Sequence, residues 1–310
     1  AVVPASCSAN HSCVAQIRAA LQTCSQTANP SSSNSSKFRH ESHAADSSRK
    51  GSDSTVGEKK LQEVPEQSDC LIQLQAGTYV IDAPRYSTAF QLSRLRNVIF
   101  QGAGPAATVL QTTDIMTLFS VDSCANVTFS DFSVDTQRVA FTMGQVVSTS
   151  PSLSEVEFDA TAAYFVDTSR YPWLLGAQAV VAYDPGNRRL SPASKGPNGD
   201  IYSLDTAIPI TYLQSTGANA RLQIKTQLPP AGQHVIIRHQ VYGYNAFTVQ
   251  YTSGIAWRNV AVMFSAGMGI YTYNTADQLL DGFNIVRPAD RDMSITADGA
   301  HFANHRGEYL

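Results

Sequence analysis

The chain has 310 residues, 43% of them hydrophobic and 15% charged, with a formal net charge of −3. This composition can supply one large core or two ordinary ones and indicates a globular protein. The sequence contains no block of basic residues, which argues against nucleic acid as a partner. It also contains no run of about 18 apolar residues, so it predicts no membrane-spanning helix.

The first predicted element is a short amphipathic helix at residues 12–24, within an N-terminal segment that comprises residues 1–29. Apolar residues recur there at helical spacing, and the Ser12 hydroxyl can cap the first amide groups. The apolar residues that define the helix are Val14, Ile17, Ala20 and Leu21.

Residues 30–69 have a different character. They are rich in Ser and in mixed charge and nearly free of large apolar side chains. Such a segment cannot bury enough apolar surface to offset the entropy lost on ordering. The sequence therefore predicts a disordered insertion.

Short runs of Val, Ile, Phe and Thr, separated by Gly, Asn and Asp, indicate strands in residues 70–144 and again in residues 235–310. The dipeptide Asn-Val returns at Asn97, Asn126 and Asn259, each time at the start of a strand. Near the C-terminus similar strands return after about 22 or 23 residues. A period slightly above 20 with several strands per unit is typical of a parallel β-helix.

We therefore expect an all-β fold built on a right-handed parallel β-helix of the pectate-lyase type. Residues 70–144 supply its first rungs, and residues 235–310 supply further rungs. An open end of such a coil exposes unpaired strand edges, so the helix at residues 12–24 is the natural cap for the first rung.

The repeat stops in residues 145–234. Alternating strands there are split by turn dipeptides such as Asn-Gly, which indicates a small antiparallel β-barrel inserted into the coil. Three aromatic residues in it could stack on a sugar, although packing in a core is the more common role for such side chains. They are Tyr171, Trp173 and Tyr183.

Cysteines and glycosylation triplets bear on the compartment. The five cysteines show no CxxC spacing, which favours disulfides over a zinc site. Three Asn-X-Ser/Thr triplets would accept glycans in a secretory pathway. Both patterns predict an extracellular or secretory protein. The candidate glycosylation sites are Asn10, Asn34 and Asn126.

Three segments near the C-terminus form an ordered set of motifs: VIIRHQVYGYNAF at residues 235–247, SAGMGIY at 265–271 and RPADRDMSITADGAHFANHRG at 287–307. Together they resemble the glycoside hydrolase family 110 exo-α-galactosidases. The resemblance implies a β-helix with an inserted barrel and hydrolysis of terminal α-linked galactose with inversion. It implies no metal and no cofactor, and a galactose-terminated glycan as the partner; the oligomeric state stays open.

The same resemblance assigns roles to individual residues. Asp298, in TADGAHF, matches an acidic residue of the family's active site, and His301 lies beside it in the same predicted strand. Glycoside hydrolysis uses a carboxyl group on each side of the scissile bond, which suits Asp298 to a catalytic role. The candidate substrate-binding residues are His301, Arg238, His239, Tyr242 and Asn245.

The chain also departs from the family's pattern. His305 stands where the family has Cys, and the family's paired aspartates, expected one rung after Asp298, would come after Leu310. This departure implies a C-terminally truncated relative, either a fragment of a longer enzyme or a protein of low activity. An offset near 23 residues would place Asp298 beside Thr275 and Ala276.

Each assignment has an alternative. Asp298 precedes Gly299, and Asp-Gly is a common turn. His301 and His239 can be structural histidines, and Arg238 can be the ion-pair partner of a carboxylate such as Asp292.

Two other functions remain open. The first is a β-helix polysaccharide lyase, which needs a base and usually an acidic calcium site. The cluster at residues 290–292 is better explained as a salt-bridged loop, because calcium takes about six or more oxygen ligands. The second is a non-catalytic glycan-binding protein.

Overall fold

A computed structural model describes residues 2–3, 13–27, 70–160, 162–195, 198–213, 219–291 and 293–309. The insertion predicted at residues 30–69 and the triplets at Asn10 and Asn34 lie outside these residues. Within the described residues the fold is all-β, as predicted, apart from the α-helix α1 (Val14–Thr27) and short 3-10 turns. The described helices include none that is long and apolar enough to cross a membrane.

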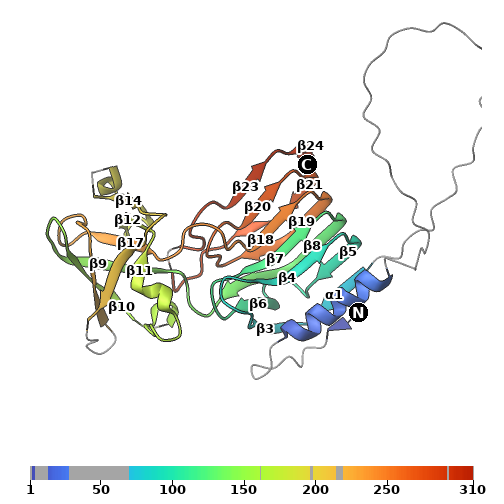
Figure 1. Ribbon diagram of the computed structural model, residues 1–310, viewed down its shortest axis with the longest axis horizontal. Coiled ribbons are helices and arrows are strands. Elements are labelled where there is room, and N and C mark those ends of the chain that lie inside the picture. The colour runs from blue at the N-terminus through green and yellow to red at the C-terminus, as the bar shows by residue number, and fades with distance from the viewer. Residues whose placement is uncertain are drawn as a thin grey trace, which may run out of the picture.

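All of the described strands outside residues 141–238 belong to two parallel sheets that share one core (Figure 1). The larger sheet contains β1 (Val2–Val3), β2 (Cys70–Leu74), β3 (Gly77–Ile81), β5 (Arg96–Gln101), β6 (Thr108–Thr112), β8 (Ala125–Thr136), β19 (Ser253–Val262), β21 (Ala276–Asp281), β22 (Asn284–Ile285) and β24 (Arg306–Tyr309). The smaller sheet contains, in spatial order, β4 (Thr88–Ser93), β7 (Thr117–Asp122), β18 (Phe247–Gln250), β20 (Ile270–Tyr273) and β23 (Ala300–Ala303).

The chain runs repeatedly through the smaller sheet and then the larger sheet, and each such run is called a pass. Strands of successive passes lie side by side in register. The offset between paired residues is 29 from Phe90 to Phe119, 23 from Phe247 to Ile270 and 30 from Ile270 to Ala300. The predicted period of about 22 or 23 therefore holds for one step and not for the others. Parallel strands need only stay in register, and the loops between them can differ in length.

The Asn-Val dipeptides lie at corners where the backbone is left-handed, a conformation that Asn tolerates well. Asn97 and Asn126 have φ values of 53° and 55° and lie one above the other, with Asn126 Nδ2 donating to Asn97 Oδ1 at 3.0 Å. Asn259 occupies the next corner of its own pass, where it donates to Asp131 at 2.9 Å. The repeat thus marks two different corners.

A stack of aromatic rings fills the core between the two parallel sheets. Phe119 and Phe247 come from neighbouring strands of the smaller sheet, and their ring centroids lie 5.3 Å apart with 6° between the planes. Phe129 of the larger sheet lies 5.0 Å from Phe247. Full burial of each ring stabilises the fold by about 1.5–3 kcal/mol, so this stack holds the sheets together.

Helix α1 lies against the first strands of both sheets (Figure 1). Arg18 Nε donates to the Ala89 carbonyl at 2.8 Å, and a disulfide links Cys24 to Cys70 at the start of β2. The predicted helix is confirmed, and the expectation of disulfides is confirmed for this one pair; Cys124 is a buried free thiol. The buried residues that α1 and the residue before it add to the core are Cys13, Val14, Ile17, Ala20, Leu21 and Cys24.

An antiparallel sheet is inserted between β8 and β18 and curls on itself (Figure 1). Its strand pairing extends from Phe141 to Arg238, beyond the predicted limits of 145–234. Each predicted limit falls within one strand, β9 (Phe141–Thr149) or β17 (His234–Arg238), and the sequence pattern does not show which strand the end of each pairs with. Tyr171, Trp173 and Tyr183 are buried in its cores. Its strands are β9 (Phe141–Thr149), β10 (Ser154–Asp159), β11 (Gly176–Ala177), β12 (Ala179–Asp184), β13 (Arg189–Leu190), β14 (Asp200–Tyr202), β15 (Ile208–Tyr212), β16 (Asn219–Ile224) and β17 (His234–Arg238).

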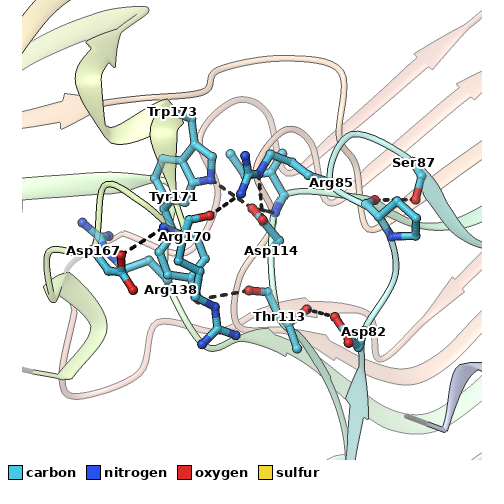
Figure 2. A network of polar contacts seen from close by, with 12 residues as sticks. Asp82, Arg85, Ser87, Thr113, Asp114, Arg138, Asp167, Arg170, Tyr171 and Trp173 are labelled. Carbon is cyan, nitrogen blue, oxygen red and sulfur yellow. Dashed lines mark hydrogen bonds and ion pairs between the residues drawn. The ribbon is translucent and has the colours of Figure 1, made fainter.

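Polar and aromatic contacts join the antiparallel sheet to the parallel strands (Figure 2). Asp114, in the loop before β7, accepts from Arg85 Nε at 2.7 Å and from Trp173 Nε1 at 2.9 Å. The Tyr171 hydroxyl donates to the Thr113 carbonyl at 3.2 Å. These contacts fix the inserted sheet against the loops that precede the strands of the smaller sheet.

Candidate active site

The candidate site lies where the antiparallel sheet meets the last strands of the smaller parallel sheet. Asp298 comes two residues before β23, and its carbonyl accepts from Gly269 N at 3.1 Å. The 30-residue offset between β20 and β23 places Asp298 beside Met268, so the expected neighbours Thr275 and Ala276 are wrong. The longer connection before β23 causes the difference.

Asp298 and His301 lie together on the outer face of the smaller sheet. Their side chains are 58% and 48% exposed, and Asp298 Oδ2 is 3.7 Å from His301 Nδ1. The His301 ring stacks on Tyr271 of the neighbouring strand, with centroids 5.7 Å apart. A solvent-accessible carboxyl group beside an imidazole is suited to moving a proton at the surface of a ligand.

Arg238, at the end of β17, connects the antiparallel sheet to the segment that carries Asp298. Its Nη2 donates to the Tyr202 hydroxyl at 2.7 Å, and its guanidinium lies 4.9 Å from the centroid of that ring. Its Nη1 donates to the Thr296 carbonyl at 3.2 Å. Because Thr296 lies two residues before Asp298, Arg238 helps to set the position of that carboxylate.

Asn245 is buried and uses its side-chain amide within the protein. Its Oδ1 accepts from Met268 N at 2.8 Å and its Nδ2 donates to Thr248 Oγ1 at 3.0 Å. A Cβ atom at Gly267 would lie 2.7 Å from Asn245 Oδ1, so this close approach requires glycine. Asn245 thus holds its own segment in register with the neighbouring segment around Met268, which in turn lies beside Asp298.

His239 lies within the antiparallel sheet and is 3% exposed. Its Nε2 is 2.9 Å from Thr142 Oγ1 and its Nδ1 is 2.7 Å from the Gly176 carbonyl. Burial, and secondarily the charge of Arg138, lowers the pKa of His239 to about 3, so the ring is neutral at physiological pH. These contacts match the structural alternative for this residue.

Of the remaining motif residues, Tyr242 is 43% exposed in the loop between β17 and β18. The structure therefore brings Arg238, Asn245, Asp298 and His301 to one region, although they come from two separate motifs. His239 is directed into the inserted sheet. Sequence reasoning did not single out Tyr271, and the motif SAGMGIY that contains it was the available signal.

The loop before Asp298 is anchored by Arg291. Its guanidinium makes a bidentate ion pair with Asp135, at 2.9 and 3.1 Å, and contacts Asp290 at 3.2 Å. Burial alone would lower the pKa of Arg291, but the two carboxylates outweigh burial and raise it. The salt-bridged loop expected here is confirmed for Asp290 and Arg291, whereas Asp292 lies outside the described residues.

The last candidate motif residue, His305, is partly buried in the interior of the final pass. Its Nδ1 is 2.9 Å from Nε2 of the buried residue Gln278. In the described parts of the chain, no three His, Cys, Asp or Glu side chains are grouped so that they could hold a metal ion.

Comparison with known proteins gives one informative relationship. No family model matches the chain. Over 197 residues it is 22% identical to the protein named Alpha-1,3-galactosidase B of Bacteroides thetaiotaomicron, and the match covers 61% of this chain and 32% of the relative. The chain thus spans about a third of that relative's length. The similarity supports a distant relationship to a glycoside hydrolase.

Proposed function

We propose that the chain acts as a glycoside hydrolase that removes terminal α-linked galactose by an inverting, metal-independent mechanism. The observation that carries the proposal is the exposed pair Asp298 and His301, with Asp298 Oδ2 3.7 Å from His301 Nδ1. The loop that carries the exposed Tyr242 is joined to the segment before Asp298, because Thr296 Oγ1 donates to the Val241 carbonyl at 3.1 Å. The name of the distant relative supports galactose as the sugar.

The chemistry assigns separate tasks to these groups. An inverting glycosidase needs one carboxyl group to protonate the leaving oxygen and another, about 6.5–9.5 Å away, to activate water. Asp298 supplies one of these carboxyl groups and protonates the leaving oxygen, and the family resemblance assigns the second, which takes a proton from the attacking water, to aspartates one rung after Asp298. His301, whose Nδ1 lies 3.7 Å from Asp298 Oδ2, binds the sugar beside it. Tyr242 contacts the sugar, Arg238 positions the segment before Asp298, and Asn245 holds the neighbouring segment around Met268 in register.

The proposed scaffold is a right-handed parallel β-helix with the antiparallel sheet closed into a barrel. In support, each pass from β4 onward adds a strand to both parallel sheets, and left-handed corner residues recur in register from pass to pass. Residues 70–144 and 235–310 are its coil segments, and residues 145–234 form most of the barrel.

An extracellular or secretory location is part of the proposal. The disulfide between Cys24 and Cys70 supports it, because such bonds persist in oxidising compartments. Asn126 is exposed at its corner and is the candidate glycosylation site within the described residues.

A glycan-binding protein without catalysis is the second candidate. The stacked and partly exposed rings of Tyr271 and His301 favour it, because aromatic faces at a surface bind sugar rings without any need for chemistry.

One experiment separates the two candidates. The purified chain is incubated with α-1,3-galactobiose, and the anomer of the released galactose is followed by proton NMR from the start of the reaction. The proposal predicts β-galactose as the first product. Binding without release would contradict catalysis by this chain and favour the second candidate, and α-galactose as the first product would overturn inversion.

A further inference from the structure

A groove lies at the opposite end of the smaller sheet from the antiparallel insertion, at the corner that follows β18, β20 and β23. It has a volume of about 400 Å³, within the range of ligand sites. The residues at its rim are Tyr251, Asn274, Asn304 and Arg306, and the buried threonines Thr252 and Thr275 also line it.

The rim of the groove is built by register. Tyr251, Asn274 and Asn304 are equivalent corner residues of three successive passes, with φ values of 50°, 51° and 50°. The backbone NH of Tyr251 donates to the Tyr273 carbonyl and that of Asn274 to the Ala303 carbonyl, each at 3.1 Å. These hydrogen bonds fix the spacing between successive passes at the corner. The rim of the groove therefore carries one ring and two amides in a row, about 4.8 Å apart.

The groove and the candidate active site lie at opposite ends of the same strands of the smaller sheet. Asn304 follows His301 by three residues in an extended strand, which is about 10 Å. Tyr273 lies between them on the neighbouring strand, and its ring packs edge-on against Tyr251 with centroids 5.9 Å apart. Partly exposed rings thus run from His301 and Tyr271 to the rim.

We propose that this groove is a distal saccharide subsite, which binds the inner sugars of a glycan whose terminal galactose lies at Asp298 and His301. The proposal rests on the function proposed above. The exposed Tyr251 ring offers a flat apolar face, and the amides of Asn274 and Asn304 supply both donors and acceptors for sugar hydroxyls. Such a subsite makes longer glycans the preferred substrates.

The chain offers matched variants to test the subsite. Tyr251→Asn removes the ring without backbone strain, because Asn is accepted at positive φ. Arg94→Asn is the control, since Arg94 occupies the equivalent corner of an earlier pass with φ 57°. Asn304→Gly removes a rim amide, and Ser123→Gly, at the same corner with φ 55°, is its control.

Binding is measured by calorimetry in the Asp298→Asn background, which suppresses turnover. The probes are α-1,3-galactobiose and a linear pentasaccharide that ends in α-1,3-linked galactose. We expect the pentasaccharide to bind about ten-fold more tightly than the disaccharide, and Tyr251→Asn and Asn304→Gly to reduce this difference while both controls retain it.

Three outcomes overturn the subsite: a pentasaccharide that binds no more tightly than the disaccharide, a difference that survives Tyr251→Asn, or no binding of either probe. If only the pentasaccharide binds, and Tyr251→Asn abolishes this binding, the subsite stands and the galactose site proposed at Asp298 fails.

Discussion

The candidate residues of the motifs at 235–247 and 287–307 differ in their exposure to solvent. His239 and Asn245 are buried, with polar side-chain atoms in contact with protein partners. Asp298, His301 and Tyr242 are open to solvent. The partners of His239 are 97 and 63 residues away in the sequence, and Asn245 accepts from Met268, 23 residues away. The motifs alone therefore predict which residues gather but not which are accessible.

His239 gives the fold a specific dependence on pH. Its pKa is about 3 in the folded protein and about 6.5 in an unfolded chain. Between these values the unfolded state binds one more proton, so the free energy of unfolding falls as the pH drops below about 6.5, by up to about 1.4 kcal/mol per pH unit. Above about pH 6.5 His239 is neutral in both states, and its protonation no longer lowers the free energy of unfolding.

The comparison of wild type with His239→Gln isolates this effect, because the carboxylates titrate in both proteins. Denaturant unfolding at pH 7 and pH 5 measures the change in the free energy of unfolding. We expect a smaller loss between the two pH values in the variant. Equal losses would show that His239 does not contribute in this way.

Among the elements, α1 depends on a covalent link to the parallel strands. The disulfide between Cys24 and Cys70 joins α1 to β2 across a separation of 46 residues. Such a link typically stabilises a fold by about 2–4 kcal/mol, because it restricts the unfolded chain. Its removal should free α1 from the first strands and expose the apolar residues beneath it.

Denaturant unfolding with and without a thiol reductant tests this link. Wild type should unfold at a lower denaturant concentration when it is reduced. The double variant Cys24→Ser and Cys70→Ser should show the lower midpoint under both conditions. A reductant that leaves the wild-type midpoint unchanged would contradict the prediction.

The antiparallel insertion depends on Asp114, which accepts hydrogen bonds from Arg85 and Trp173 (Figure 2). Asp114→Ala leaves these partly buried donors without an acceptor and should lower the free energy of unfolding by about 1–3 kcal/mol. Asp281→Ala is the control, because its ion pair with Arg258 is exposed and is worth at most about 1 kcal/mol. Equal effects in denaturant unfolding would argue against a special role for Asp114.

For the whole molecule, the sequence predicts the fold class because strand alternation, turn residues and helical spacing are local signals. It predicts α1 and the antiparallel insertion for the same reason. Register is not local: the offset is 23 from Phe247 to Ile270 but 30 from Ile270 to Ala300. A single assumed period therefore misplaces Asp298, whose neighbour is Met268.

The candidate site could be predicted only in part. The motifs identify Asp298, His301 and Arg238, which the structure brings to one region. The rings that surround them, Tyr271 and Tyr202, reach the site through strand pairing and side-chain direction, which single-sequence patterns do not specify.

The function proposed for Asp298 is that of a catalytic carboxyl group in a galactosidase. The most direct measurement is the rate of galactose release from α-1,3-galactobiose by wild type, Asp298→Asn and Asp277→Asn. Asp277 is an exposed corner residue with φ 54°, where Asn is readily accepted. We predict a loss of about 10²–10⁴-fold for Asp298→Asn and an unchanged rate for Asp277→Asn. Full activity of a folded Asp298→Asn variant would contradict the claim.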